Sequence, residues 1–358
     1  MKHHFNPEFA EQLNAAKKYF EEDFRSDLKE DRTSNYIIFL GTGMSSWVTK
    51  LGNLTTPRTG AGARVVMDGT ALHIDPGYLA ASQARKYCGI VPIDGVLVSH
   101  VHSDGCCGLQ EMLFYARQGG LGKSKPTLVG NPTLVDGFEL DGIKRHFLPN
   151  DPIFLSNLEE LIRLNSGEKT KVGNVEIYGT PCYHPEWFRR EPLSKVSNSI
   201  GFRLKSSSGL DLSWVGETTV FGEAETHWGE ARSLVKGAYA RTGSGKLDQI
   251  AEAHYGAQVL IVSIATLIPN QISPGNHLRI DGVYELAKAV KPKLVCLTDI
   301  SGECDLPRMN DLSANVYDPK QVATETYIQR AALDLEQELS LPVKVMYDGT
   351  TINLNSLC

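Results

Sequence analysis

Metal-binding residue types cluster after a short apolar segment at residues 95–98. This segment is typical of a buried strand, and His100, His102 and Asp104 follow it directly. In extended backbone, residues two apart point to the same side, so the two histidines can converge on one point. Imidazole and carboxylate ligands together suit zinc, iron or manganese. We therefore favour a metal site over the alternative of two surface histidines and a turn aspartate.

A metal at this position would support hydrolysis. A bound divalent ion lowers the pKa of its water from above about 15 to about 7, and so supplies hydroxide at neutral pH. The same ion polarises the electrophile that the hydroxide attacks. Metal-assisted hydrolysis is therefore a chemistry that this cluster permits.

The overall composition is that of an ordinary globular protein. The 358 residues are 41% hydrophobic, 22% charged and 8% aromatic. A net charge of −6 argues against general nucleic-acid binding. No apolar run approaches the length of a membrane span, and the first residues lack the apolar core of a signal peptide. The seven cysteines are odd in number and show no framework spacing, so we expect reduced thiols and a cytoplasmic protein.

Two regions of the chain differ in pattern. Residues 1–33 carry apolar side chains at helical spacing, and predict a helical extension. We expect this helix to dock on its own domain, with a homodimer contact as the alternative. Residues 34–358 alternate short strands with helices, and the length could hold one large α/β domain or two small ones. The expected strands are 36–40, 64–67, 71–74, 95–98, 127–130, 175–179, 200–204, 212–215, 259–264, 294–297, 343–346 and 351–354; the expected helices are 109–118, 155–164, 281–290 and 320–339.

The histidine motif resembles that of a known family. His100-x-His102-x-Asp104 after an apolar strand is similar to the HxHxDH motif of the metallo-β-lactamase superfamily. The segment FLGTG at 39–43 resembles the opening strand and loop of the ribonuclease Z and phosphodiesterase branch. The resemblance implies a four-layer αββα sandwich, with the N-terminal helix added outside.

The resemblance also implies a set of metal ligands with three departures from the family. Gly105 stands where the motif has its last histidine, Glu217 where the family has a bridging aspartate, and Asp299 where it has a histidine. The second site is thus oxygen-rich, and favours manganese, iron or magnesium over a second zinc. We expect one tightly bound divalent ion and one weaker one. The implied first site is His100, His102 and His184 with Glu217 shared, and the implied second site is Asp104, Glu217 and Asp299.

Four further residues have candidate roles at this site. The resemblance to the phosphodiesterase branch makes His277 a phosphate contact or general acid, and it stands with Asp104 as a candidate catalytic residue. Arg189 and Arg190 could bind an anionic substrate, although a solvated loop is the simpler interpretation. Asp75, in an Asp-Pro-Gly turn that resembles a family motif, either braces the histidine loop by hydrogen bonding or serves only as turn chemistry.

Two further segments each have a structural interpretation as well as a functional one. Cys106 and Cys107 flank the motif, but their register is off by one for a ligand, so we expect them to pack under the loop. Residues 221–255 look irregular, and form either a substrate lid or a plain surface insertion.

Three functions are compatible with these residues. The first is a metal-dependent phosphodiesterase acting on a nucleotide or another small anionic phosphodiester. The second is hydrolysis of a lactone, ester or thioester at the same site. The third is a member that has lost its second metal and binds a ligand or partner without turnover, which Gly105 favours and the remaining acidic residues oppose.

Overall fold

The computed structural model describes most of the chain. The described residues are 32–44, 58–60, 62–89, 91–119, 124–140, 142–148, 152–184, 186–188, 191–192, 198–220, 246–264, 278–300, 307–309 and 322–357. The predicted N-terminal helix, apart from residues 32 and 33, lies outside them, as do Arg189, Arg190 and His277.

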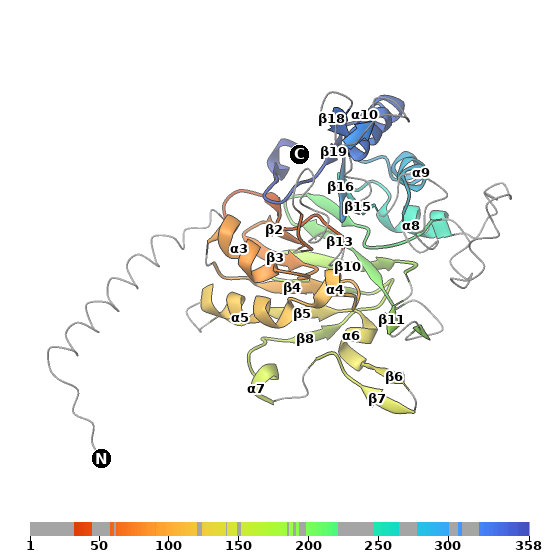
Figure 1. Cartoon of the computed structure of the whole chain (residues 1–358). Helices are drawn as coiled ribbons and strands as arrows, with labels where there is room; N and C mark the ends of the chain where they lie inside the picture. Colours follow the sequence, from red (N-terminus) through yellow and green to blue (C-terminus); the bar gives the residue numbers. More distant parts are fainter. Residues whose placement is uncertain are drawn as a thin grey trace, which may run out of the picture.

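Two seven-stranded sheets form the centre of the protein (Figure 1). The first sheet has the order β20-β1-β2-β3-β4-β5-β8, with β20 Thr351–Asn353, β1 Tyr36–Phe39, β2 Ala63–Met67, β3 Thr70–Ile74, β4 Gly95–Val98, β5 Thr127–Gly130 and β8 Leu161–Arg163. The second has the order β19-β16-β15-β14-β13-β10-β9, with β19 Val343–Val345, β16 Leu294–Thr298, β15 Val259–Ser263, β14 Asp211–Trp214, β13 Ile200–Ser206, β10 Val175–Pro181 and β9 Lys169–Val172.

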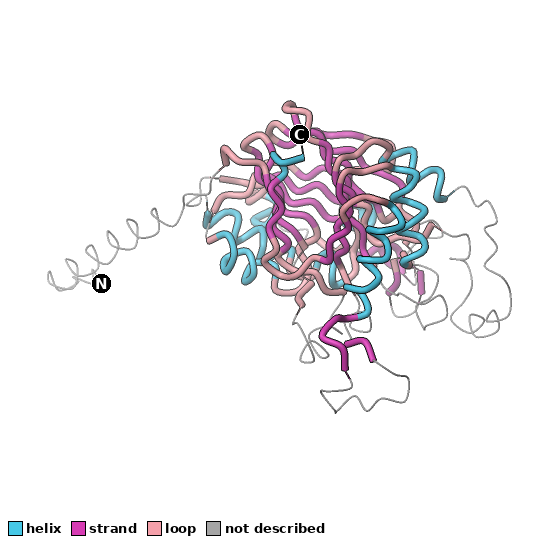
Figure 2. Tube along the Cα trace, turned by 90° about the horizontal axis from the view of Figure 1, so that it is seen from above, coloured by secondary structure: helices cyan, strands magenta, loops and turns pink. Residues whose placement is uncertain are grey.

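Three hydrophobic layers hold the sheets and helices together. The central layer joins side chains of both sheets, such as Phe39 and Leu97 from the first and Phe202 and Ile261 from the second. Helices cover the outer faces, so the strands lie between two helical layers (Figure 2). Strands such as β4 are buried along their whole length, because both faces of the sheet are covered. The predicted four-layer sandwich is therefore confirmed.

The helices divide between the two sheets. Beside the first sheet lie α3 Ala80–Cys88, α4 Ser103–Cys106, α5 Leu109–Gly119, α6 Pro132–Asp136 and α7 Pro152–Leu155, and beside the second lie α8 Lys246–His254, α9 Ile280–Val290 and α10 Tyr327–Leu339. The 3-10 turn η2 Leu354–Leu357 follows β20. Three two-stranded antiparallel sheets complete the described elements: β6 Phe138–Leu140 with β7 Ile143–Arg145, β11 Trp187–Phe188 with β12 Glu191–Pro192, and β17 Pro307–Met309 with β18 Val322–Thr326. Among the described helices we find none with the length and hydrophobicity that crossing a bilayer requires.

Three local predictions from the sequence were wrong. The expected helix 155–164 is a short helix α7 followed by strand β8, because residues 161–163 pair in parallel with β5 and complete the edge of the first sheet. The expected helix 320–339 starts only at Tyr327, where Thr326 forms a capping box with Gln329. The segment predicted as irregular contains helix α8, while residues 221–245 lie outside the described part of the chain.

The chain brings the candidate residues to one edge of the sandwich. Strands β3, β4 and β5 run parallel in the first sheet, as do β14, β15 and β16 in the second. Loops after β3, β4, β10, β14 and β16 therefore carry the polar residues discussed below. A parallel bridge between Gly43 and Ile300 connects a loop of the first sheet to a loop of the second.

Asp348 fixes the 39–43 loop beside this edge. One of its carboxylate oxygens accepts hydrogen bonds from the backbone N–H and hydroxyl of Thr42, at 3.0 and 2.9 Å. The other oxygen accepts from the backbone N–H and hydroxyl of Thr59, at 2.8 and 2.9 Å. A single carboxylate from the C-terminal region thus holds two N-terminal segments in place.

We expect Asp348→Ala to lower the free energy of unfolding by about 2–4 kcal/mol, because five donors, including Nε2 of Gln83 at 3.3 Å, lose this acceptor. Denaturant unfolding of purified protein measures this change. Asp334→Ala is the matched control, because Asp334 is exposed and pairs with Arg330 on the surface of α10, where the expected change is below about 1 kcal/mol. Equal changes in the two variants would contradict the role given to Asp348.

Candidate metal centre

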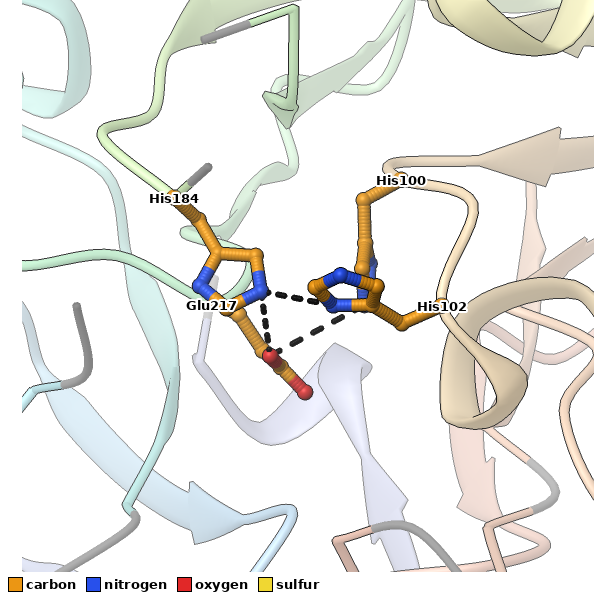
Figure 3. Close-up of side chains that lie close together, drawn as sticks. All are labelled: His100, His102, His184 and Glu217. Atoms are coloured by element: carbon orange, nitrogen blue, oxygen red, sulfur yellow. Dashed lines mark hydrogen bonds and ion pairs between the residues drawn. The ribbon is translucent and has the colours of Figure 1, made fainter. Parts of the chain in front are cut away.

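The loop after β4 presents His100 and His102 to the edge of the sandwich. His100 is 3% exposed, and its Nε2 lies 3.2 Å from Oδ1 of Asp104, one helical turn later. The His100 and His102 rings meet edge to face, with centroids 5.1 Å apart. The two imidazoles therefore turn toward a common point, as expected for residues two apart after a strand (Figure 3).

His184 and Glu217 reach the same point from the second sheet. His184 follows β10, and its Nε2 lies 2.8 Å from Nδ1 of His102. Glu217 follows β14, and its Oε2 lies 3.0 Å from Nε2 of His184 and 3.8 Å from Nε2 of His100 (Figure 3). One ligand atom from each of these four residues lies within 4.8 Å of the others. Three imidazole nitrogens with one carboxylate oxygen form a donor set that fits zinc.

A second cluster consists of oxygen donors alone. Carboxylate oxygens of Asp104, Glu217 and Asp299 also lie within 4.8 Å of one another. Asp299 follows β16 with a backbone φ of 48°, a left-handed conformation that aspartate adopts more readily than most residues. Because Glu217 belongs to both clusters, its carboxylate occupies the position from which it can bridge two ions. An all-oxygen set fits hard ions such as manganese, iron or magnesium.

The acidic residues perturb one another strongly. Burial, together with the charges of Glu217 and Asp104, raises the pKa of Asp299 well above its usual range. Burial and the charge of Asp104 raise the pKa of Glu217 to about 7. Burial alone would lower the pKa of His100, but the nearby carboxylates of Glu217 and Asp104 raise it to about 10. The carboxylates thus lie too close together for all of them to be ionised at once. A divalent cation bound between them would remove this repulsion.

A cavity opens on the oxygen cluster. Its carboxylates are Asp75, Asp104, Glu217 and Asp299, and no lysine or arginine is among the described residues that line it. Glycines 41, 43, 60 and 62 form much of the remaining wall. His100 and the three residues of the oxygen cluster therefore also line this cavity.

A hydrogen-bonded chain sets the orientation of His100. Asp75 accepts from the backbone N–H of Ser99 at 2.7 Å, from the Ser99 hydroxyl at 2.8 Å and from Nε1 of Trp214 at 2.9 Å. Because that hydroxyl donates to Asp75, it accepts from Nδ1 of His100, which lies 3.0 Å away. Nδ1 therefore holds a proton and Nε2 faces the cluster, which is the tautomer that a ligand requires. The bracing role considered for Asp75 is confirmed.

A family model described as a beta-lactamase superfamily domain matches residues 70–300, which contain all the residues of both clusters. The chain belongs to the beta-lactamase superfamily. A UPF0173 metal-dependent hydrolase of Rubrobacter xylanophilus is 26% identical over 182 residues, and the match covers 49% of this chain and 62% of that protein.

Solved structures share the superfamily fold at low sequence identity. The metallo-beta-lactamase fold protein YhfI of Bacillus subtilis aligns with a TM-score of 0.56 at 11% identity, over 89% of this chain and 99% of the other. A diphosphatase from the PhnP family aligns at 0.55 and 17% identity, over 89% and 97%. Unliganded yeast PDE1 aligns at 0.55 and 14% identity, over 89% and 99%. At these identities the similarity establishes the fold.

Packing explains why this member of the superfamily has Gly105. A Cβ atom at residue 105 would lie 2.7 Å from the carbonyl oxygen of His100 and 2.8 Å from its ring atoms Cε1 and Nδ1. No side chain fits between helix α4 and the His100 ring without moving one of them. The path of the main chain at α4 therefore accounts for the absence of the family's histidine at residue 105. Cys106 is half-buried and packs against the hydrophobic layer beside the first sheet, whereas Cys107 is exposed, so the prediction that both pack under the loop was wrong for Cys107. Neither belongs to the clusters found among the described residues.

The sequence did not single out the residues that support the ligands. Ser99, Trp214 and Glu186 each hydrogen-bond to the ligand loop or to its brace. Glu186 lies two positions after His184, and this proximity was the one signal that could have pointed to it. His277, Arg189 and Arg190 lie outside the described residues, so their roles stay predictions.

We expect Gly105→Ala to lower the free energy of unfolding by about 1–3 kcal/mol, although alanine is normally the better helix former. The added methyl group displaces His100, so zinc affinity should fall as well. Thermal unfolding and zinc titration measure the two effects. Ser103→Ala, at an exposed position of the same helix, is the control and should change stability by less than about 0.5 kcal/mol. A Gly105→Ala variant as stable as the control would refute the packing argument.

Proposed function

We propose that this protein is a metal-dependent hydrolase, and specifically a phosphodiesterase acting on a nucleotide or another small phosphodiester. The observation that carries the proposal is the pair of overlapping donor clusters that share Glu217. Two ions held side by side in this way suit in-line displacement at phosphorus, where both the attacking and the leaving oxygen gain negative charge.

The residues divide between the two ions by donor type. We assign zinc to His100, His102 and His184 with Glu217 shared. The second ion, manganese or iron, falls to Asp104, Glu217 and Asp299, because these offer only oxygen. When bound, the ions supply a water activated for attack and polarise the phosphoryl oxygens.

The charge of the cavity favours an anionic substrate once the ions are present. Its described lining contains four acidic side chains and the His100 imidazole but no lysine or arginine, so the metal-free protein offers a phosphodiester anion little positive charge. Two divalent cations would add the positive charge that such an anion needs. Substrate binding should therefore depend on metal binding.

Three further roles belong to the proposal. Asp104 is assigned to orient the attacking water, because its carboxylate belongs to the oxygen cluster and lies 3.2 Å from His100 of the histidine cluster. His277 is assigned to protonate the leaving group, and Arg189 and Arg190 to bind the substrate's distal negative charge. The diphosphatase and PDE1 structures that share the fold make phosphodiesters and diphosphates the first compounds to test.

We expect elemental analysis to find about two ions per chain after incubation with zinc and manganese, of which Asp299→Asn loses the weaker one. His102→Ala should lose the zinc. Asp334→Asn, on the exposed surface of α10, should keep both. If Asp299→Asn still holds about two ions, the oxygen cluster is not the second site.

We expect metal-loaded wild-type protein to hydrolyse a phosphodiester such as bis(p-nitrophenyl) phosphate. His102→Ala and Glu217→Gln should each lower kcat at least about 100-fold, because each removes a ligand of the reacting centre. Loss in His102→Ala with activity kept in Glu217→Gln would leave a one-metal hydrolase. Turnover of lactones or thioesters alone would instead identify an ester-type hydrolase, and turnover of no substrate by metal-loaded protein would indicate a binding function.

A further inference from the structure

Glu186 is a buried acidic residue that belongs to neither ligand cluster. It is 3% exposed and lies two residues after His184, in the loop that follows β10. A carboxylate placed out of water costs free energy unless its oxygens are well paired. Its hydrogen-bond partners therefore indicate what it is retained for.

Three donors from segments that follow strands β4 and β5 converge on this carboxylate. Oε1 accepts from the backbone N–H of Val101 at 3.0 Å and from Nδ2 of Asn131 at 2.6 Å. Oε2 accepts from the hydroxyl of Thr133. That hydroxyl is itself an acceptor for Nδ2 of Asn198 at 3.1 Å, which leaves its proton for Glu186. Both oxygens of Glu186 are thus satisfied by groups outside its own loop.

The bond to Val101 has a particular position in the candidate metal centre. The Val101 N–H belongs to the peptide that directly follows His100, between the two ligand histidines. On its other side this loop is held at Ser99, whose N–H donates to Asp75 and whose carbonyl accepts from Ile200 at 3.0 Å. Further along, the carbonyl of His102 accepts from the N–H groups of Gly105 and Cys106 at 3.1 and 3.0 Å. The bond to Glu186 therefore holds the peptide that lies between these two anchored points of the loop.

We propose that Glu186 is a positioning residue that sets the geometry of the histidine cluster. One end of its loop carries the ligand His184. Its carboxylate accepts a hydrogen bond from the backbone N–H of Val101, which lies between His100 and His102. The two ligand-bearing loops come from different sheets, and Glu186 connects them directly, so that the three imidazoles converge before a metal arrives. This inference rests on the proposed function, because it presumes that the three histidines bind a metal.

A purely structural role would have a different signature. Asn131 also caps helix α6, since its side-chain oxygen accepts from the N–H of Leu134 at 3.1 Å. If Glu186 served only to stabilise this capped turn, its loss would lower the stability of the fold without a separate effect on zinc affinity. The position of the Val101 amide and the affinity for zinc therefore distinguish the two roles.

Three variants of Glu186 test the proposal in the full-length chain. Glu186→Ala removes all the bonds, Glu186→Asp keeps the charge but is one methylene too short to reach Val101, and Glu186→Gln keeps the reach and an acceptor without the charge. Glu159→Ala, at an exposed glutamate, is the matched control. The readouts are the zinc dissociation constant, by competition with a chromophoric chelator, and hydrogen exchange at the Val101 amide.

We expect Glu186→Ala and Glu186→Asp to weaken zinc binding by about 10–100-fold and to accelerate exchange at Val101, as for other residues that orient metal ligands. Glu186→Gln should stay within about 3-fold of wild type. If Glu186→Ala does not fold, Glu186→Asp against Glu186→Gln still decides the matter. Wild-type affinity in Glu186→Asp, or a loss in Glu186→Gln as large as in Glu186→Asp, would overturn the positioning role. Failure of the wild-type chain to bind zinc would overturn the proposed function itself, and this inference with it.

Discussion

Repulsion among the carboxylates gathered at one edge of the sandwich is the constraint that the rest of the structure has to satisfy. Asp104, Glu217 and Asp299 follow three different strands and meet at distances where all three cannot be ionised together without a compensating cation. A fold that placed them there for stability alone would be a poor solution. The cluster is explained if it binds a cation, whose positive charge balances the carboxylates. The rest of the architecture holds the three carboxylates close to one another.

Each part of the site has its own anchor in the scaffold. Asp75 orients His100 through Ser99, Glu186 holds the next peptide of the same loop, and Asp348 fixes the glycine-rich wall of the cavity. On the opposite side, the thiol of Cys182 donates to the backbone carbonyl of Glu217 at 2.7 Å. These anchors are themselves mostly buried, so the ligand loops gain rigidity although they lie at the ends of strands rather than within them.

Much of this arrangement could be predicted from the sequence, because a strand that is buried on both faces of a sheet has a short run of apolar residues. Strands β4 and β16 are of this kind, whereas β10 alternates buried and half-buried residues and β14 contains Asp211 and Ser213; each of the four is followed by a residue of the two clusters. Strand β8 was missed because the leucines of the segment 155–164 also fit a helix, and its pairing with β5 is a contact between distant segments. Glu186 was missed for the same reason, since its three partners lie 53 to 85 residues away.

The contact between Gly105 and the His100 ring bears on how such a site can change. Ligand exchanges are usually pictured as swaps of one side chain on a fixed frame. Here the frame itself occupies the volume that a larger residue would need, so restoring a histidine at 105 would first require helix α4 to withdraw from the ring. Variation toward a nitrogen-richer second site must therefore pass through a shift of the main chain, and single-residue libraries at this position would be expected to return glycine.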